Sequence, residues 1–314
     1  MMAARAPSSI DVVIVTADTR ELVLECVERL DDPAIARVIV VDNGSRDGTS
    51  QALSERHPEV VCLRVEQPLG FASACNRGAE QGEAPLILFL NSDVLALQGA
   101  VSSLARELEA DPEAVAAGGR LVDPGTHATQ ERYGPKRFPT PATFAVRLSG
   151  LEQLWPGNPW TRRQTITLNG QASRPVEQPA GACILVRRSV FAKLSGFDES
   201  YWFWYEDVDL ARRLADCGTL LHVPAAVFEH VGGASFARWD RARKVRSLLH
   251  GMLRYAEAHF DRSQRLAFAA LLLALSAPRA VLFRPFDRDL ADAHRAISAE
   301  AVRLARGRRV GELV

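Results

Sequence analysis

The sequence has few cysteines, and their spacing matches neither a disulfide framework nor a zinc site. Five of the 314 residues are cysteine, an odd number, and no two of them stand as Cys-x-x-Cys. A disulfide framework and a structural zinc site are therefore not expected, and a reducing compartment is the natural location. The first nine residues contain one arginine and no apolar stretch, so we expect no secretory signal there.

Long hydrophobic runs are scarce as well. The most apolar stretch of the C-terminal part, residues 266–277, is followed by Pro278 and Arg279, whereas a membrane-spanning helix needs about 20 apolar residues. We therefore expect no membrane span. A buried helix is the first interpretation of this stretch, and an interfacial helix flanked by arginines is the second.

Apolar and charged residues are both present in ordinary amounts. The chain is 47% hydrophobic and 24% charged, which is typical of a globular protein with a sizeable core and excludes intrinsic disorder, collagen-like repeats and a multi-pass membrane protein. The net charge of zero hides an asymmetry. Residues 236–314 hold 16 Lys and Arg against 8 Asp and Glu, a net of +8, so residues 1–235 carry −8. This basic tail is expected to meet an anionic partner such as nucleic acid, phospholipid or a diphosphate.

Strand-like and helix-like stretches alternate through the first part of the chain. Continuous apolar runs predict strands over 11–16, 38–42, 60–65 and 86–90, and helical spacing predicts helices over 21–30, from 49 and over 71–81. This alternation indicates a mainly parallel sheet that helices cover on both faces. Ligands of such sheets bind beyond the carboxyl ends of the strands.

The second part of the chain interrupts this pattern. Residues 123–179 are rich in Pro, Gly, Thr and Trp, which favours irregular structure or a mobile loop. Further on, we expect a strand over 181–187, a short helix from 189, a helix over 206–217 with acidic residues in its first turn, and only helices past 236. The expected architecture is an α/β domain over residues 1–235 followed by a helical C-terminal extension over residues 236–314.

Carboxylates lie at or just beyond the carboxyl ends of three predicted strands: Asp18, Asp42 and Asp93. Asp93 closes the triplet Asn91-Ser92-Asp93, where a carboxylate can hold a divalent cation beside the phosphates of a ligand. Asp42 can accept an N–H of a nucleobase. For both residues the alternative is a turn that caps a helix.

Small residues open the predicted helix after Gly70. They let a ligand or the backbone approach closely, and Asn76 or Arg77 could reach a phosphate. The alternative is tight packing of the helix on the sheet.

Five consecutive aromatic residues, 201–205, precede Glu206 and Asp207. One element cannot point all five rings into a core, so some are expected to line a cleft. Carboxylates beside apolar rings have raised pKa values, which suits a general base, although acidic residues also simply favour a helix N-terminus. His230 ends a short apolar strand and is structural unless it lies near Asp93, where an imidazole could complete a metal shell.

Seven blocks, in this order, together resemble one known family. The blocks are VVIVT (12–16), VIVVDNGSRDGT (38–49), GFASACNRG (70–78), LFLNSD (88–93), PAGACILVRRSVFAKLSGFDE (179–199), YEDVDLARRLADCG (205–218) and FEHVGGAS (228–235). Over about residues 10–235 the chain resembles the inverting family 2 glycosyltransferases with the GT-A fold, a Rossmann-like, mainly parallel sheet flanked by helices. It is most similar to the rhamnosyltransferase-like branch, whose members act in cell-wall or polysaccharide biosynthesis.

The resemblance implies roles for individual residues. Asp207, in a pair with Glu206, matches the catalytic base. Asp93 and His230 match ligands of a Mg²⁺ or Mn²⁺ ion that bridges the diphosphate of the donor. The residues implied in nucleotide binding are Thr16, Asp18, Asp42, Gly70, Asn76 and Ser92, and those implied in acceptor binding are Trp202, Trp204 and Tyr205.

Two positions depart from the family pattern. Ala17-Asp18 stands where the family usually has Tyr-Asn, whose ring stacks on the base, and Asn91 replaces the first acid of the metal triplet. The leading donor by resemblance is dTDP-rhamnose, with UDP- and GDP-sugars as alternatives. The acceptor is a glycan or a polyprenyl-diphosphate-linked glycan. A catalytically silent carbohydrate-binding or assembly subunit is the alternative function.

Other enzyme classes that share such a sheet fit the sequence less well. A Rossmann dehydrogenase or nucleotide-sugar pyrophosphorylase is not expected, because no Gly-x-Gly-x-x-Gly pattern follows the first strand. The basic tail interleaves few aromatics with its arginines, so nucleic acid is not an expected partner. We expect a cytoplasmic protein with peripheral attachment to an anionic membrane surface, at the inner face of the cell membrane.

Overall fold

The chain divides into two compact units. The computed structural model describes residues 9–166, 170, 172–233 and 239–312. Unit 1 comprises Met1–Arg137, Thr165–Asp198 and Leu210–Ser235, and unit 2 comprises Phe138–Gln164, Glu199–Asp209 and Phe236–Val314. This division differs from the sequence-based boundaries in one respect, because residues 138–164 and 199–209 group with the C-terminal helices.

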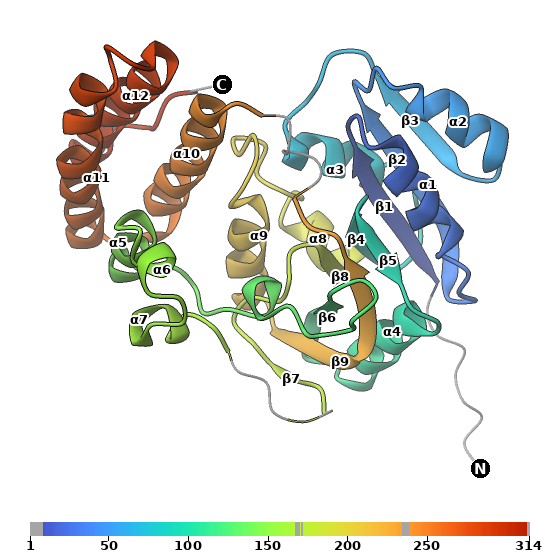
Figure 1. Cartoon of the computed structure of the whole chain (residues 1–314). Helices are drawn as coiled ribbons and strands as arrows, with labels where there is room; N and C mark the ends of the chain where they lie inside the picture. The colour runs from blue at the N-terminus through green and yellow to red at the C-terminus, as the bar shows by residue number, and fades with distance from the viewer. Residues whose placement is uncertain (1–8, 167–169, 171, 234–238, 313–314) are drawn as a thin grey trace. The chain divides into compact units, whose positions relative to one another are not determined.

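Unit 1 is built on a mixed sheet with nine strands among the described residues (Figure 1). The strand order is β3-β2-β1-β4-β8-β6-β9-β5, and β7 pairs with β9. The strands are β1 (Ile10–Thr16), β2 (Ile35–Asn43), β3 (Val61–Val65), β4 (Leu86–Asn91), β5 (Val94–Ala96), β6 (Ala114–Val122), β7 (Arg174–Pro175), β8 (Cys183–Arg187) and β9 (Thr219–His230). The helices are α1 (Arg20–Glu28), α2 (Thr49–Arg56), α3 (Phe71–Ala79), α4 (Ala100–Ala110), α8 (Arg188–Lys193) and α9 (Glu206–Ala215), whose first turn belongs to unit 2.

Strands β3, β2, β1 and β4 form the parallel part of the sheet, as the apolar runs predict. Beyond β4 the sheet is mixed, because β8 runs antiparallel to β4 and β6. Every residue of β1 is buried, since helices cover both faces. Val12 and Ile14 belong to the core cluster that includes residues of α1. On the opposite face, a Cβ at Gly78 of α3 would lie 2.5 Å from Val13, so only a glycine allows this close approach.

A buried ion pair ties the N-terminal end of β1 to α8. Asp11 accepts hydrogen bonds from the backbone N–H of Ala84 (2.8 Å) and from Arg188 Nη2 (2.6 Å). Arg188 also donates to the carbonyl oxygens of Ala79 and Ala84. Removing one partner from such a buried pair destabilises a fold by about 3–5 kcal/mol. The pair therefore anchors the sheet at the edge opposite to the carboxyl ends of its parallel strands.

Unit 2 is helical and has an aromatic core. Its helices are α5 (Pro141–Leu148), α6 (Leu151–Leu154), α7 (Pro159–Arg162), α10 (Arg241–His259), α11 (Arg262–Leu282) and α12 (Arg288–Ala305). Phe144 of α5 lies 4.9–6.1 Å, between ring centroids, from four further rings: Tyr205, Tyr255, Phe260 and Phe268. These contacts explain why residues 138–164 and 199–209 belong with the C-terminal helices.

The segment 123–179 is more regular than its composition suggests. The prediction of irregular structure or a mobile loop is wrong for α5, which begins with Pro141 at its first position and a capping box on Thr140. The short helices α6 and α7 and a 3₁₀ turn, Glu131–Tyr133, lie in the same segment.

Helix α11 is longer than the sequence indicated. It continues through Pro278 to reach 21 residues. Among the described residues it is the one helix whose length and composition would suffice to cross a membrane, and 28% of its most apolar window is buried. Its buried residues are Phe268, Ala269, Leu272, Ser276 and Ala280. One face of α11 is therefore covered, and much of the remainder is not.

Candidate active site

The carboxyl ends of β1, β2 and β4 lie at one edge of the sheet in unit 1. The register pairs Thr16 with Asp42 and Val15 with Asn91. Hydroxyl groups connect the loops that follow: Thr16 bonds to Thr19 (2.8 Å), which bonds to Ser92 (3.2 Å). The predicted residues Thr16, Asp42 and Ser92 are thus brought to one edge.

Asp42 and Asp18 cross-link the loops after β2 and β1. Asp42 is fully buried, and its two oxygens accept hydrogen bonds from the backbone N–H of Ser45 (3.0 Å) and from the hydroxyl of Ser50. Asp18 accepts from the backbone N–H of Arg46 (2.7 Å), and its own N–H donates to Ser45 Oγ (2.9 Å). These contacts fit the turn interpretation of Asp42, and its contact with a nucleobase stays a prediction.

Two asparagines hold α3 and the residue before its N-cap against neighbouring segments. Asn43 exchanges two hydrogen bonds with the backbone of Leu69 (2.9 and 2.8 Å), just before Gly70, the N-cap of α3. Asn76 does the same with the backbone of Phe197 (3.0 and 2.9 Å). The Asn76 carboxamide thus bonds to the segment that follows α8, and the predicted role in nucleotide binding stays a prediction.

Asp93 and His230 come together through strand pairing. Strand β5 runs antiparallel to the end of β9, with Val94 opposite His230, and the Val231 N–H donates to the Asp93 carbonyl oxygen (3.0 Å). Both side chains are buried, and His230 Nε2 lies 3.8 Å from Asp93 Oδ1. His230 therefore lies near Asp93, as a metal-ligand role would require, and that role stays a prediction.

Gln130 fixes which ring nitrogen of His230 carries the hydrogen. The Gln130 amide nitrogen donates to Asp123 Oδ1 and to the His230 carbonyl oxygen, both at 2.7 Å. Its carbonyl oxygen then faces His230 Nδ1 at 2.9 Å. Because an amide oxygen can only accept, Nδ1 carries the hydrogen and the Nε2 lone pair points towards the Asp93 carboxylate.

A cation between these two groups would resolve the repulsion of their lone pairs. Burial lowers the pKa of His230, against the opposing charge of Asp93, and a neutral imidazole is the form that binds metals. The described residues contain no group of three or more His, Cys, Asp or Glu arranged to hold an ion. A metal held by Asp93 and His230 would therefore need ligand oxygens and water to complete its shell.

Sequence patterns did not reveal the residues that support His230. Gln130 and Tyr133, whose ring packs edge-on against His230 with 4.6 Å between ring centroids, lie in the segment interpreted as irregular. Neither residue belongs to a motif, and both act through tertiary contacts alone.

In unit 2, the turn before Glu206 and Asp207 is strained. Trp204 and Tyr205 have φ values of 69° and 74°, in the left-handed region that bulky residues avoid. Each such residue costs about 1–3 kcal/mol, which surrounding contacts must offset. The two carboxyl groups therefore follow a backbone conformation that the rest of unit 2 imposes.

Helix α10 holds this turn in place. A Cβ at Gly251 would lie 2.5 Å from the Trp204 carbonyl oxygen, so only a glycine allows this approach. Ser247 Oγ donates to the Phe203 carbonyl oxygen (3.0 Å), and the Tyr205 ring is buried in the aromatic core. The Tyr205 ring is enclosed by neighbouring rings, and its contact with an acceptor stays a prediction.

The rest of the aromatic run divides between core and surface. Tyr201 is buried in the same core as Tyr205, whereas Trp202, Phe203 and Trp204 are half-buried. Trp239 packs against Phe203 and Trp204 with 5.0 and 5.9 Å between ring centroids. The middle three rings are thus the ones left partly accessible, and both the expected cleft and acceptor binding by Trp202 and Trp204 stay predictions.

Glu206 and Asp207 occupy different environments. Glu206 is 6% exposed, and its Oε2 has no hydrogen-bond partner among the described residues. Burial and the adjacent negative charge of Asp207 raise the pKa of Glu206 to about 8. Glu206 is therefore protonated at neutral pH, while Asp207 is only half-buried. Neighbouring carboxyl groups with different environments are typical of acid–base sites.

Comparison with known protein families identifies the class of protein. Residues 11–195 match the model of the glycosyl transferase family 2, and this chain belongs to that family. Residues 167–233 also match the model described as the N-terminal domain of galactosyltransferase.

A curated relative shares the enzyme class. The chain is 36% identical over 206 residues to an N-acetylglucosaminyl-diphospho-decaprenol L-rhamnosyltransferase from Mycobacterium tuberculosis. The match covers 62% of this chain and 66% of that protein, so the chain spans just under two thirds of the length of this relative.

Solved structures confirm the GT-A fold. GalNAc-T7 with UDP, GalNAc and Mn²⁺ superposes with a TM-score of 0.58 at 16% identity, covering 93% of this chain and 55% of that one. The mannosyltransferase PcManGT from Pyrobaculum calidifontis, in complex with GDP-Man and Mn²⁺, gives 0.52 at 17% identity, covering 95% and 88%.

The hydrogen bonds of Gln130 predict the tautomer of His230. In protein without added metal, His230 should carry its hydrogen on Nδ1, as long-range ¹H–¹⁵N correlation spectra of the imidazole can measure. His250 is an internal control of the opposite kind, because its Nε2 lies 2.9 Å from the Gly311 carbonyl oxygen and must carry the hydrogen. Gln130→Leu should give a mixture of tautomers at His230 and leave His250 unchanged. A hydrogen on Nε2 of His230 in the wild-type protein would contradict the assignment.

The raised pKa of Glu206 predicts a pH-dependent stability. The folded protein holds a proton that the unfolded chain, with an ordinary value of 4.5, releases. The contribution of Glu206 to stability is therefore largest below pH 4.5 and falls as the pH rises to about 8. Glu206→Gln should remove this loss. Between pH 4.5 and about 8, the free energy of unfolding of the variant should therefore rise by a few kcal/mol relative to that of the wild type.

Urea unfolding followed by tryptophan fluorescence measures this difference, because all five tryptophans lie in unit 2 together with Glu206. The exposed Glu25 gives the matched control, Glu25→Gln, whose difference from the wild type should stay flat between pH 5 and pH 8. A flat difference for Glu206→Gln as well would show that this carboxyl is ionised in the folded protein.

Proposed function

We propose that this chain is a metal-dependent inverting glycosyltransferase that transfers L-rhamnose from dTDP-rhamnose to a lipid-linked acceptor. The observation that carries the proposal is the buried Asp93–His230 pair, whose lone pairs face each other across 3.8 Å. Membership of the glycosyl transferase family 2 supports the reaction class. The name of the mycobacterial relative supports rhamnose as the sugar and a diphospho-decaprenol glycan as the acceptor.

Asp93 and His230 would hold a Mg²⁺ or Mn²⁺ ion. When bound, the ion supplies positive charge that neutralises the departing diphosphate. One oxygen and one nitrogen donor favour Mn²⁺, because Mg²⁺ prefers an all-oxygen shell. The two solved neighbours contain Mn²⁺, which supports the same choice.

Asp207 acts as the general base. Its carboxylate takes the proton of an acceptor hydroxyl while the hydroxyl oxygen bonds to the anomeric carbon, on the face opposite the diphosphate. The bond between the anomeric carbon and the diphosphate oxygen breaks, and its electron pair leaves with the nucleoside diphosphate. One displacement inverts the anomeric centre without a covalent enzyme intermediate. Glu206 stays protonated beside Asp207, which leaves one negative charge in the turn.

The loops after β1 and β2 would hold the nucleotide. Ala17 offers no ring for stacking on the base, so recognition falls to polar groups such as Asp18 in the cross-linked loops. All five cysteines are free, which supports a cytoplasmic location for the reaction.

A panel of nucleotide sugars tests the reaction. Wild-type protein should release nucleoside diphosphate fastest from dTDP-rhamnose when Mn²⁺ and a diphosphate-linked acceptor are present. Asp207→Asn should lower kcat by about 10²–10⁴-fold, because a general base contributes that much, while the KM for the donor stays near that of the wild type. Asp216→Asn, an exposed acid just beyond α9, is the matched control and should keep full activity. Absence of release from every donor would favour the silent carbohydrate-binding subunit.

Donor binding tests the metal site separately from turnover. Calorimetry with dTDP and Mn²⁺ should show binding that Asp93→Asn weakens at least tenfold, since charge-assisted contacts contribute about 1.5–3 kcal/mol. In the presence of a chelator, the wild type and the variant should bind equally. The exposed Asp31 supplies the control Asp31→Asn, with unchanged affinity. Wild-type affinity that is indifferent to the chelator would remove the metal from the mechanism.

A further inference from the structure

Helix α11 carries an apolar stripe that unit 2 does not cover. Exposed residues recur every three or four positions along it, and this spacing places them on one face. They are Leu266, Ala270, Ala274, Ala277 and Val281. The stripe reaches the C-terminal end of the helix, where Val281 is 75% exposed and Leu282 is 63% exposed. Phe286, in the turn to α12, is 84% exposed.

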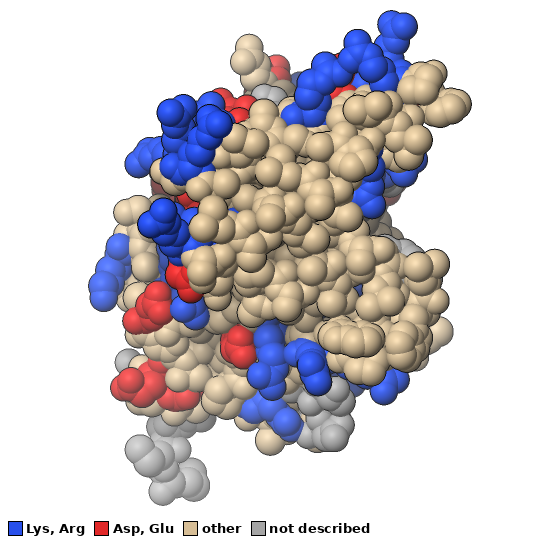
Figure 2. Space-filling view, turned by 90° about the vertical axis from the view of Figure 1, so that its left-hand side faces the viewer, with Lys and Arg blue, Asp and Glu red and all other residues tan. Residues whose placement is uncertain are grey.

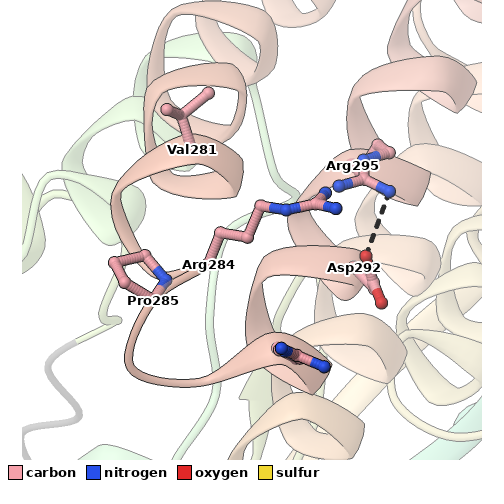
Figure 3. Close-up of a pocket in the computed structure, with 6 residues that line it drawn as sticks. Val281, Arg284, Pro285, Asp292 and Arg295 are labelled. Carbon is pink, nitrogen blue, oxygen red and sulfur yellow. Dashed lines mark ion pairs between the residues drawn. The ribbon is translucent and has the colours of Figure 1, made fainter.

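Arginines surround the end of this stripe. A surface pocket of about 620 Å³ at the α11–α12 turn is lined by Val281, Arg284, Pro285, Arg288, Asp292 and Arg295. Arg295 pairs with Asp292 at 3.2 Å, and Arg284 extends towards Arg295 (Figure 3). Among the described residues, neither Arg284 nor Arg288 has a carboxylate within ion-pair distance. The pocket thus holds three guanidinium groups against one carboxylate.

The surface around the stripe and the pocket is also uncharged at its centre and bordered mainly by basic side chains. On the side where Figure 1 draws α11 and α12, Figure 2 shows a broad uncharged area with Lys and Arg side chains, and fewer Asp and Glu side chains, around its edges. A helix with an apolar face and arginines at its ends is typical of the interface between headgroups and acyl chains. Guanidinium groups bind phosphate oxygens in a bidentate manner.

We propose that this docking face, formed by the α11 stripe together with Leu282, Phe286, Arg284 and Arg288, binds the surface of an anionic lipid bilayer. The apolar side chains enter the boundary of the acyl chains, and the two arginines bind lipid phosphates. Charge favours lipid over a second copy of the chain. In a symmetric pair the same patch meets itself, so two surfaces of net positive charge would be brought together.

Docking on a bilayer is independent of the proposed reaction, because it requires neither donor nor acceptor. It places a glycosyltransferase at the surface where lipid-linked acceptors are anchored. Point substitutions in the full chain are the appropriate test, since truncation near residue 236 would remove helices that form the core of unit 2.

Co-sedimentation with vesicles tests the proposal. The wild type should bind phosphatidylcholine vesicles that contain phosphatidylglycerol and should bind weakly to phosphatidylcholine alone. Arg284→Gln with Arg288→Gln should weaken binding roughly 30-fold, and Phe286→Ser roughly tenfold. All these positions are exposed, and thermal unfolding checks that each variant is folded.

Matched controls remove arginine charges and an exposed apolar side chain at positions outside the docking face. Arg29→Gln with Arg106→Gln takes two exposed charges from unit 1, and Leu154→Ser removes an apolar side chain that is also 84% exposed. Both should keep wild-type binding. Equal losses in the controls, or no binding by the wild type, would overturn the proposal. Light scattering that shows a dimer dissolved by Phe286→Ser, with vesicle binding unchanged, would assign the face to a second copy instead.

Discussion

The candidate site of unit 1 depends on the pairing of a three-residue strand, β5, with the last residues of β9. Side chains alternate along a strand, so a slip of one residue would turn His230 to the other face of the sheet and away from Asp93. The parallel strands bring loops to the edge, but only this antiparallel pairing sets the carboxylate and the imidazole against each other. Gln130 then fixes the ring so that its lone pair, rather than its hydrogen, faces Asp93.

Local patterns predicted the parallel part of the sheet, because β1, β2 and β4 are buried runs whose apolar character is continuous. They also indicated the position of Asp93, since a carboxylate after a buried strand lies at the edge where such sheets bind ligands, and its role as a metal ligand stays a prediction. The support from Gln130 and the strain at Trp204 arise only from tertiary contacts and leave no local signal. The cap of α5 did have one, Thr140 before Pro141, which the composition of the surrounding segment masked. The continuation of α11 through Pro278 has a physical reason. Proline has no N–H to donate to the carbonyl of Ala274, but Ala274 and Pro278 are exposed, so this carbonyl can bond to water instead.

Different interactions hold the candidate residues of the two units in place. In unit 1, polar side chains cross-link loops, as Asp18, Asp42 and Asn43 do, and the site is held by hydrogen bonds. In unit 2, Gly251 lets α10 press against the turn that precedes Glu206, and the aromatic core around Phe144 holds it. This arrangement in unit 2 encloses Glu206 beside the half-buried Asp207, and this burial together with the adjacent charge raises the pKa of Glu206.

The left-handed conformation of Trp204 and Tyr205 costs stability but keeps the segment before Asp207 in one conformation. A glycine at either position would release the backbone strain, and selection for heat resistance alone would favour that relaxation. The same change would remove an aromatic ring and let the segment before Asp207 sample many conformations. An engineer seeking a hardier enzyme should therefore improve the remainder of the helical unit and leave this costly bend untouched.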